Sequence, residues 1–403
     1  MTAKATAALM AADLARAFDS PWPAFDAARL HAVGLAQAGR ATEALAVIEA
    51  YRGLVESDAS PEQRGRFWAD YAYVLNTARR LRDTDFALQQ AIDNAQALGD
   101  IAELATLTSN LATVKGNLGQ VPDALALALR SLALQAQLGV TDGPEGAVVE
   151  TYAGLYCGMV GRYEEALQRL DAALACFVRD RQAVWIAVAS NHKAQLLIDL
   201  GQFARARQAL DYERPAIDHI RARRATIAAR VERALGHTGR SLLASAVGEL
   251  GPGADPHVRM HVLLDGTDGD EPAAGVRRCD EVLQMALALE FAGVAMKARI
   301  LRAHAQSRAG DVAAAAAAMH DLLRQVEQVQ PADLYLAHVW WLAAQVFEAN
   351  GDGDQALMAL AQGALWVRRT ALPNVPEPFR DSFLQRNPTN RALLAAADRR
   401  LAR

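Results

Sequence analysis

Residues 161–167 read Gly-Arg-Tyr-Glu-Glu-Ala-Leu, a glycine followed by an aromatic two positions on and an Ala-Leu pair five and six positions on. Before Gly161, an apolar run at helical spacing contains Gly154, and after it Ala166 and Ala173 recur at the same spacing. The stretch therefore predicts two amphipathic helices that meet in a turn at Gly161. Small residues on the facing sides allow such paired helices to approach closely.

The same turn pattern returns along the whole chain, in some copies without the aromatic. Its other copies lie at Gly39, Arg82 (a degenerate copy), Gly119, Gly201, Gly239, Gly310 and Gly351. From residue 39 to residue 239 successive copies are about 40 residues apart, longer than the 34 residues of the standard tetratricopeptide repeat. The longer period indicates longer helices or looser loops.

These positions resemble the tetratricopeptide repeat, and their long period is similar to the sensor regions of large bacterial signal-responsive transcription activators. The tail Val375–Leu384, followed by Asn387-Pro388, resembles the segment that closes those regulators. The resemblance covers nearly the whole chain. It implies an all-α fold, a right-handed superhelical solenoid of about nine helical hairpins with a C-terminal capping helix.

We expect a single solenoid over residues 1–403, because a repeat array grows by stacking and need not split into domains. Its expected parts are a leader (1–20), regular hairpins (24–250), an irregular loop region (251–275), further regular hairpins (276–371), and a proline-rich tail with the capping helix (372–403). No phosphate-binding loop motif and no spare basic helix pair is found. The resemblance therefore implies an isolated sensor or adaptor array; a genuine Met1 start and a capped end slightly favour a whole chain.

The composition argues against several classes of protein. Hydrophobic residues make up 52% of the 403 residues and charged residues 22%, which indicates a folded chain. The net charge of −4 argues against direct binding of nucleic acid, which normally needs a clustered basic excess. No run of 18 apolar residues occurs and the N-terminus lacks a secretory core, so we expect a cytoplasmic protein with no membrane segment. Three scattered cysteines are expected to be buried, reduced thiols.

If the repeat positions carry over, the first helix of each hairpin lines a concave groove. The polar residues expected on that face, and hence the candidate contacts to a partner, are Asn76, Arg79, Arg80, Ser109, Asn110, Thr113, Asn117, Asn191 and Gln195. Asparagine amides can pair with an extended peptide backbone, and arginine forks can pair with carboxylates. The alternatives are that the arginines lie in a solvated hairpin end and that the asparagines join neighbouring helices.

The spacing of Asn76 and Asn110 also resembles the two asparagines of carboxylate-clamp repeats, which grip chaperone C-termini. The cationic positions of that clamp fall here on Ala72, Val148 and Tyr152. The departure makes a true clamp doubtful.

Two further motifs suggest metal binding without meeting its requirements. His257 and His261 have a metal-compatible spacing, but the glutamate of the zinc-protease motif and a third ligand are missing. The acidic run 265–271 lacks the alternating spacing of a calcium loop, so we expect it to be solvated. We accordingly predict no metal, no cofactor and no catalytic residues.

The sequence thus predicts a non-enzymatic scaffold that binds a protein or peptide segment in its groove, as a regulatory adaptor or signalling module. One alternative is the small-ligand-sensing domain of a bacterial transcription activator, with residues 251–275 closing a pocket. A second is an enzyme whose site is assembled across hairpins. That site would need a converging cluster of ionisable residues, and none is found at recognisable spacing.

Overall fold

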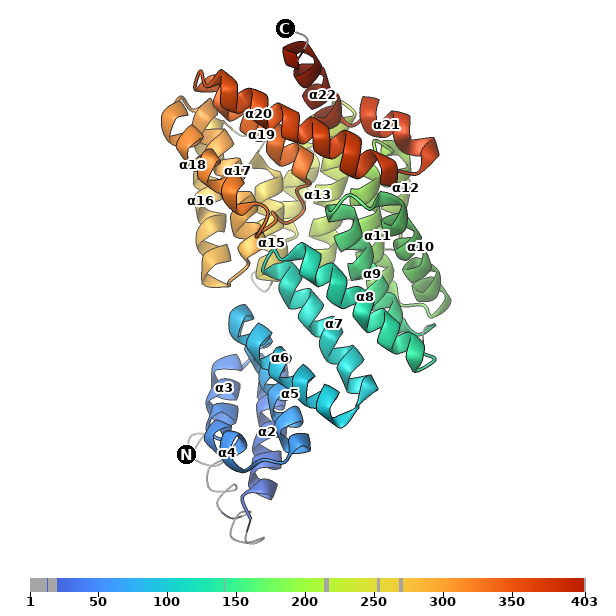
Figure 1. The fold of residues 1–403 in the computed structure, drawn as a ribbon, viewed down its shortest axis with the longest axis vertical. Coiled ribbons are helices and arrows are strands. Elements are labelled where there is room, and N and C mark those ends of the chain that lie inside the picture. The colour runs from blue at the N-terminus through green and yellow to red at the C-terminus, as the bar shows by residue number, and fades with distance from the viewer. Residues whose placement is uncertain are drawn as a thin grey trace.

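The computed structural model of the protein describes residues 13, 20–140, 142–213, 217–251, 254–267 and 271–401, and over these ranges nine helical hairpins follow one another (Figure 1). The hairpins are α2 (Trp22–Gln37) with α3 (Ala41–Glu49), α5 (Pro61–Thr77) with α6 (Leu81–Leu98), α7 (Ile101–Asn117) with α8 (Val121–Gln137), α9 (Pro144–Met159) with α10 (Tyr163–Arg179), α11 (Ala183–Asp199) with α12 (Phe203–Ala209), α13 (Asp218–Ala234) with α14 (Arg240–Gly248), α15 (Pro256–Asp265) with α16 (Pro272–Ala288), α17 (Ala292–Arg308) with α18 (Val312–Gln325), and α19 (Leu336–Ala349) with α20 (Gly353–Leu365). A short helix, α4 (Arg52–Asp58), links the first two hairpins. The predicted all-α solenoid is confirmed. The expected leader lies outside the described residues apart from Asp13 and Ser20.

The predicted turn glycines have the backbone conformation that the hairpins require. Gly161 has a φ of 86°, in the left-handed region that favours glycine. Its N–H donates to Gly158 O at 3.1 Å and the N–H of Arg162 donates to Cys157 O at 2.8 Å, which together form a Schellman cap. These bonds satisfy the last carbonyls of α9 and send the chain back into α10.

The degenerate turn expected at Arg82 lies three residues earlier. Arg79 takes the glycine position with a φ of 59°, and the N–H of Arg80 donates to Leu75 O at 3.0 Å. The shift makes Leu81 the first residue of α6, where its side chain is fully buried. Burial of Leu81 thus sets the register of this hairpin.

Packing between hairpins builds one long core. A single cluster of buried apolar side chains runs from Phe25 to Ala397, and smaller clusters flank it. The small residues predicted to allow close packing do so, since a Cβ on Gly154 would lie 2.8 Å from Leu170 Cγ. Each hairpin therefore depends on its neighbours for burial of its apolar face.

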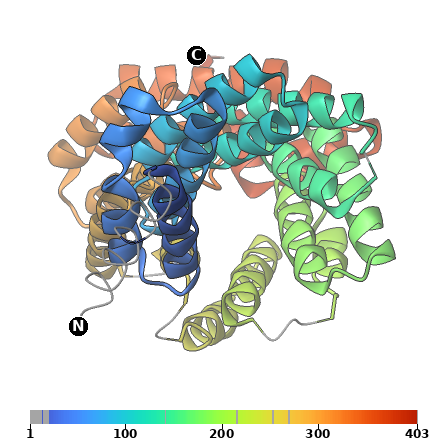
Figure 2. The same ribbon diagram turned by 90° about the horizontal axis from the view of Figure 1, so that it is seen from below.

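The superhelix curves far enough for its second half to contact its first half. Figure 2, a view along the long axis, shows the helices curving around a central axis. The backbone N–H of Gln330 donates to Gly119 O at 2.8 Å, and Asn387 Nδ2 donates to Asp199 O at 2.7 Å. Gly201 lies against the backbone of Ser382. The turns of the middle hairpins therefore serve as contact points for the later hairpins and the tail.

The expected irregular region, 251–275, needs a correction. Pro256–Asp265 form helix α15, which Asp255 caps by accepting a hydrogen bond from the N–H of His257 at 2.8 Å, and Pro272 starts α16. Residues 252–253 and 268–270 are not described. A ten-residue helix between glycine-rich stretches is too short to give a clear periodic signal, so the sequence pattern missed it.

The C-terminal segment closes the core. After α20 the chain continues through a π-helical stretch (Trp366–Ala371) and two short 3-10 turns, η3 (Leu372–Asn374) and η4 (Glu377–Phe379). It then forms α21 (Arg380–Gln385) and α22 (Pro388–Leu401), and α22 packs on α19 and α20. The predicted capping helix is therefore present.

The contact between the two halves can be tested by comparing Gly201→Ala with Gly139→Ala. Both glycines have a φ of 70°, so alanine should cost each variant about 1 kcal/mol of backbone strain. A Cβ at Gly201 would overlap Ser382 O, whereas nothing lies within 4 Å of one at Gly139. We expect Gly201→Ala to lose about 1–3 kcal/mol more than Gly139→Ala in thermal or urea unfolding. Equal losses would mean that this contact does not stabilise the fold.

Candidate functional site

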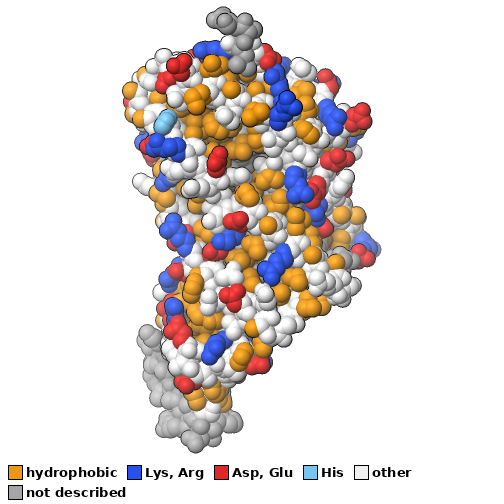
Figure 3. All heavy atoms as spheres, viewed as in Figure 1, with side chains coloured by type: hydrophobic (Ala, Val, Ile, Leu, Met, Phe, Trp, Pro, Cys, Tyr) orange, Lys and Arg blue, Asp and Glu red, His pale blue; other side chains and the backbone are white. Residues whose placement is uncertain are grey.

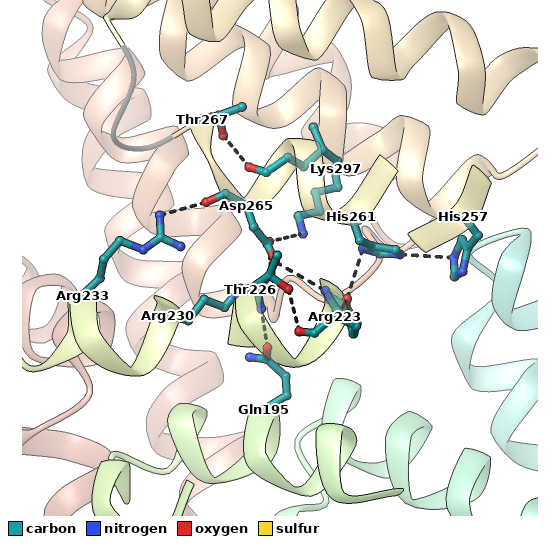
Figure 4. Close-up of polar contacts among 12 residues, drawn as sticks. Gln195, Arg223, Thr226, Arg230, Arg233, His257, His261, Asp265, Thr267 and Lys297 are labelled. Carbon is teal, nitrogen blue, oxygen red and sulfur yellow. Dashed lines mark hydrogen bonds and ion pairs between the residues drawn. The ribbon is translucent and has the colours of Figure 1, made fainter. Parts of the chain in front are cut away.

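The first helices of three successive hairpins bring ionisable side chains together inside the superhelix (Figure 4). Helix α13 supplies Arg223 and Arg230, α15 supplies His261 and Asp265, and α17 supplies Lys297. Arg223 and Arg230 are seven residues apart and His261 and Asp265 are four apart, so each pair shares one face of its helix.

Asp265 is the centre of this cluster. Its carboxylate accepts hydrogen bonds from Arg230 and, at 3.3 Å, from Lys297 Nζ, and its side chain is only 2% exposed. Arg223 Nη1 lies 3.4 Å from the same carboxylate. Although burial acts to raise the pKa of Asp265, these cations outweigh it and hold the pKa well below its usual value. Asp265 is therefore charged at neutral pH.

Asp333 adds a second, largely buried carboxylate from the segment between α18 and α19. It accepts a hydrogen bond from Arg223, and His261 Nδ1 lies 3.1 Å from its Oδ2. Burial again opposes ionisation, but Arg223 and the other nearby cations keep the pKa of Asp333 well below the usual value. The cluster thus holds three cations, Arg223, Arg230 and Lys297, against two carboxylates.

Two histidines extend the cluster towards α7, whose Thr113 and Asn117 line the same cavity. The Nε2 atoms of His257 and His261 are 3.2 Å apart, and the ring of His257 stacks on Phe291 with centroids 4.7 Å apart. Desolvation lowers the pKa of His257 to about 4 and that of His261 still more clearly. Both rings are therefore neutral at pH 7, and one must donate to the other.

A cavity of about 310 Å³ lies beside this cluster on the concave side of the array. Three of the predicted groove residues line it, Thr113, Asn117 and Asn191. The other polar groups in its wall are Tyr152, Tyr156, His192, His219, Arg223, Asp255, His257, His261 and Asp333. Apolar wall residues include Leu155, Met159 and Val188, so the cavity combines apolar surface with convergent polar groups, as ligand sites do.

A second cavity, also of about 310 Å³, lies on the other side of Asp333. Gln195, a further predicted groove residue, lines it together with Asp199, Arg230 and Lys297. Desolvation raises the pKa of Asp199 to about 7, against the opposing effect of Arg230. Desolvation also lowers the pKa of Lys297, although the charge of Asp265 opposes that shift.

The remaining predicted groove residues lie away from both cavities. Asn76, Arg80 and Asn110 are exposed, Ser109 is half-buried, and none of the four lines either cavity. Arg80 pairs with Asp83 at 2.6 Å, which agrees with the alternative that this arginine lies in a solvated hairpin end.

Arg79 instead joins distant parts of the array. It pairs with Asp255 at 2.8 Å, and its guanidinium lies over the ring of Phe291, 5.9 Å from the centroid. Its side chain is one third exposed. It therefore links the end of α5 to α15 and to the start of α17, and is not a free anion anchor.

The ionisable cluster was not predicted from the sequence, and one expectation is wrong, since residue 265, expected in a solvated acidic loop, is buried. Ionisable residues converge on the concave side although no recognisable motif in the sequence marks them. The helical spacing of Arg223 with Arg230 and of His261 with Asp265 was the available signal. Partner helices could not be assigned from it, because Arg223 and Asp333 are 110 residues apart.

Other kinds of site receive little support from the described surface. On the face drawn in Figure 3, acidic and basic side chains are interspersed among apolar ones, without a large field of one sign over the described residues. Among the described helices none is long and apolar enough to cross a membrane. Within the same ranges no group of three or more His, Cys, Asp or Glu side chains is arranged to hold a metal ion.

The fold is that of a tetratricopeptide-repeat superhelix. Residues 103–178 match the family model of the tetratricopeptide repeat. A solved structure of NprR in complex with its cognate peptide NprX is 11% identical, covers 94% of this chain and 98% of that chain, and has a TM-score of 0.50. The apo form of the quorum sensor NprR from B. thuringiensis is 11% identical, with 84% and 97% covered and a TM-score of 0.48. A Rap protein complexed with competence and sporulation factor is 11% identical, with 94% and 98% covered and a TM-score of 0.45. Among curated protein sequences, none matches this chain.

Replacing Asp265 by asparagine tests the buried ion network. The variant leaves Arg230 and Lys297 buried without their shared carboxylate, so we expect a loss of about 3–5 kcal/mol in unfolding free energy. The matched control is Asp321→Asn, which breaks an exposed pair with Arg324 and should change stability by less than about 1 kcal/mol. Similar thermal unfolding of the two variants would contradict this account of the cluster.

The raised pKa of Asp199 predicts a pH-dependent effect of Asp199→Asn. Because the folded-state pKa of about 7 is above the usual 3.8, the wild type has this group's full stabilisation below pH 3.8 and loses it as the pH rises towards 7. Asparagine stays neutral, so the Tm of the variant minus that of the wild type should increase from pH 4.5 to pH 7.5. Histidine titrations are common to both proteins and cancel in this difference. A difference that is constant with pH would show that Asp199 has an ordinary pKa.

Proposed function

We propose that this chain is a non-enzymatic regulatory module that binds a peptide segment inside its superhelix, in the cavity of about 310 Å³ beside Asn117 and Asn191. The observation that carries the proposal is this cavity, in which amide and hydroxyl groups from α7 and α11 converge with Arg223 of α13 and the two imidazoles of α15. Amide side chains can both donate to and accept from a peptide backbone. The apolar wall can receive the peptide's side chains.

The cavity is also held in a defined shape, which favours binding. Asn191 is buried, and its Oδ1 accepts a hydrogen bond from Tyr212 at 2.9 Å. The hydroxyl of Tyr156 donates to Ala112 O at 3.3 Å. Groups that are already ordered lose little freedom when a ligand binds. A peptide in this cavity would therefore bear most of the entropic cost itself.

The comparison with NprR is in line with this proposal. That superhelix was solved in complex with its cognate peptide, and the present chain shares its fold at 11% identity. Fold likeness at this level leaves the ligand of this chain open, so the proposal depends on the cavity. We also infer a cytoplasmic location, on the ground that Cys157, Cys176 and Cys279 are buried free thiols.

The ionisable cluster does not favour an enzyme over a binding module. Asp265 and Asp333 are both ion-paired, and their lowered pKa values make them poor proton donors. Lys297 is paired with Asp265 at 3.3 Å. The arrangement resembles a structural ion network more than a set of groups with matched acid and base roles.

A small-ligand sensor is the second candidate, and one observation favours it. Asp255 and helix α15 form part of the cavity wall, so residues from the stretch 251–275 do contribute to the pocket. Its volume of about 310 Å³ is at the lower end of the range for small-molecule sites.

Selection from a display library of short random peptides tests the peptide proposal. Peptides enriched on the wild-type protein should lose at least tenfold in affinity, about 1.4 kcal/mol, on an Asn117→Ala/Asn191→Ala double variant. The matched control is Asn76→Ala/Asn110→Ala, which removes two exposed amides of the same type and should bind as the wild type does.

Two outcomes would contradict the proposal. One is that no peptide is enriched, and the other is that enriched peptides bind both double variants equally. If the selection fails and a metabolite from a small-molecule panel raises the Tm of the wild type but not of the Asn117→Ala/Asn191→Ala variant, the small-ligand alternative takes its place.

A further inference from the structure

The segment 326–335, which connects α18 to α19, runs through the interior of the superhelix. The N–H of Gln330 donates to Gly119 O at 2.8 Å, and the N–H of Ala332 donates to Gly293 O at 3.0 Å. The segment is thus bonded through its main chain to the turn between α7 and α8 and to the start of α17. Extended peptides are held in grooves by main-chain bonds of this kind.

The two glycines allow this close passage. A Cβ on Gly119 would lie 2.7 Å from Val329 Cγ1 and 3.0 Å from Gln330 O, and one on Gly293 would lie 3.2 Å from Gln330 O. Any larger residue at either position would push the segment away. The groove is therefore shaped, at these two points, around a passing backbone.

Asp333 is the acidic residue that this segment buries in the interior. Its side chain is 11% exposed and is held by Arg223 of α13, and Nδ1 of His261 of α15 lies 3.1 Å from it; both residues line the first cavity as well. Its φ of 53° lies in the left-handed region, which residues other than glycine, asparagine and aspartate rarely adopt. The backbone conformation at this position is therefore one that an aspartate can adopt.

The cations around Asp333 require a carboxylate at this position, but that carboxylate can come from another chain. If Asp333 leaves, three largely buried cations, Arg223, Arg230 and Lys297, face only Asp265 and Asp199, whose pKa is about 7, and this excess of positive charge needs another anion nearby. The end of the segment is anchored separately, because Tyr335 donates from its hydroxyl to Asn387 Oδ1 at 3.0 Å. Residues 329–334 can therefore move while α18 and α19 stay in place.

We propose that Arg223 and His261 form a carboxylate subsite of the peptide-binding cavity, which Asp333 occupies in the absence of ligand. An acidic side chain of the incoming peptide takes over this subsite and displaces residues 329–334 from the groove. The proposal rests on the proposed function of peptide binding and adds the chemistry of the ligand, an acidic peptide. It also makes the cavity a switch, because binding of an acidic peptide in the subsite releases residues 329–334 from the groove.

The test uses full-length protein and a labelled synthetic peptide with the segment's own sequence, 328–336, with both ends blocked. The protein variant is Asp333→Asn, which removes the competing carboxylate and keeps a residue that tolerates the left-handed conformation. We expect this peptide to bind Asp333→Asn at least tenfold more tightly than the wild type. A matched peptide with asparagine in place of its aspartate should bind both proteins equally weakly, and Arg223→Met in the Asp333→Asn background should abolish the gain.

A third peptide distinguishes binding of a side-chain carboxylate from binding of a C-terminal carboxylate. It ends after the position of Ala332 with a free C-terminus, so its terminal carboxylate replaces the acidic side chain. Tighter binding of this peptide than of the aspartate peptide to Asp333→Asn would overturn the assignment to an acidic side chain. Equal affinity of the aspartate peptide for wild type and folded Asp333→Asn would overturn the subsite itself.

Hydrogen exchange on the wild-type protein provides a measurement that needs no variant. At saturating concentrations of the aspartate peptide, the amides of Gln330 and Ala332 should lose their acceptors and exchange faster. Unchanged or slower exchange of these amides with the peptide bound would overturn the displacement. Failure of this proposal is distinguishable from failure of the proposed function, because peptides selected from the random library would still depend on Asn117 and Asn191 without releasing the segment.

Discussion

The structure depends on the return of the superhelix onto itself through backbone contacts at its turns. Gly119, Gly161 and Gly201 all have positive φ values, and each faces a residue from the second half of the chain. The same glycines that end the first helices therefore leave room for a second layer of backbone. A side chain at these positions would hold the two halves apart, and the groove of an open solenoid would remain open. Their close contact makes the interior narrow and partly closed.

Closure of the interior explains its unusual electrostatics. Charged groups on the concave face of an open array would be solvated, and their pKa values would stay near the usual ones. Here desolvation lowers the pKa of His257 and raises that of Asp199, and charges persist only where they are paired, as at Asp265. The ion network is thus a consequence of the curvature, because the curvature brings side chains from α13, α15 and α17 together with Asp333 and, through Arg230, with Gln195 of α11.

The features of the fold that the sequence could predict are those that residues within one hairpin determine. The turn at Gly161 follows from residues within one hairpin, and so does the repeat that makes the chain a solenoid. The sequence could not tell Asn117 and Asn191, which line the cavity, from Asn76 and Asn110, which are exposed, because their separation depends on the curvature of the whole array. The contact between Arg223 and Asp333 is of the same kind, since it joins hairpins that only the superhelical return brings together.

Burial of an ion cluster seldom stabilises a fold more than apolar packing would, since desolvation offsets most of the attraction. Its stronger effect is on which ligands the interior accepts. Arg223, Arg230 and Lys297 outnumber Asp265 and Asp333, Asp199 has a pKa of about 7, and His257 and His261 are neutral at pH 7. The whole chain has a net charge of −4, so its interior differs in sign from its average surface. A cationic ligand would be repelled at close range in a medium that screens poorly, whereas an anionic group placed against Arg223 completes the balance. The selectivity of the cavity therefore follows from the count of buried charges more than from its volume.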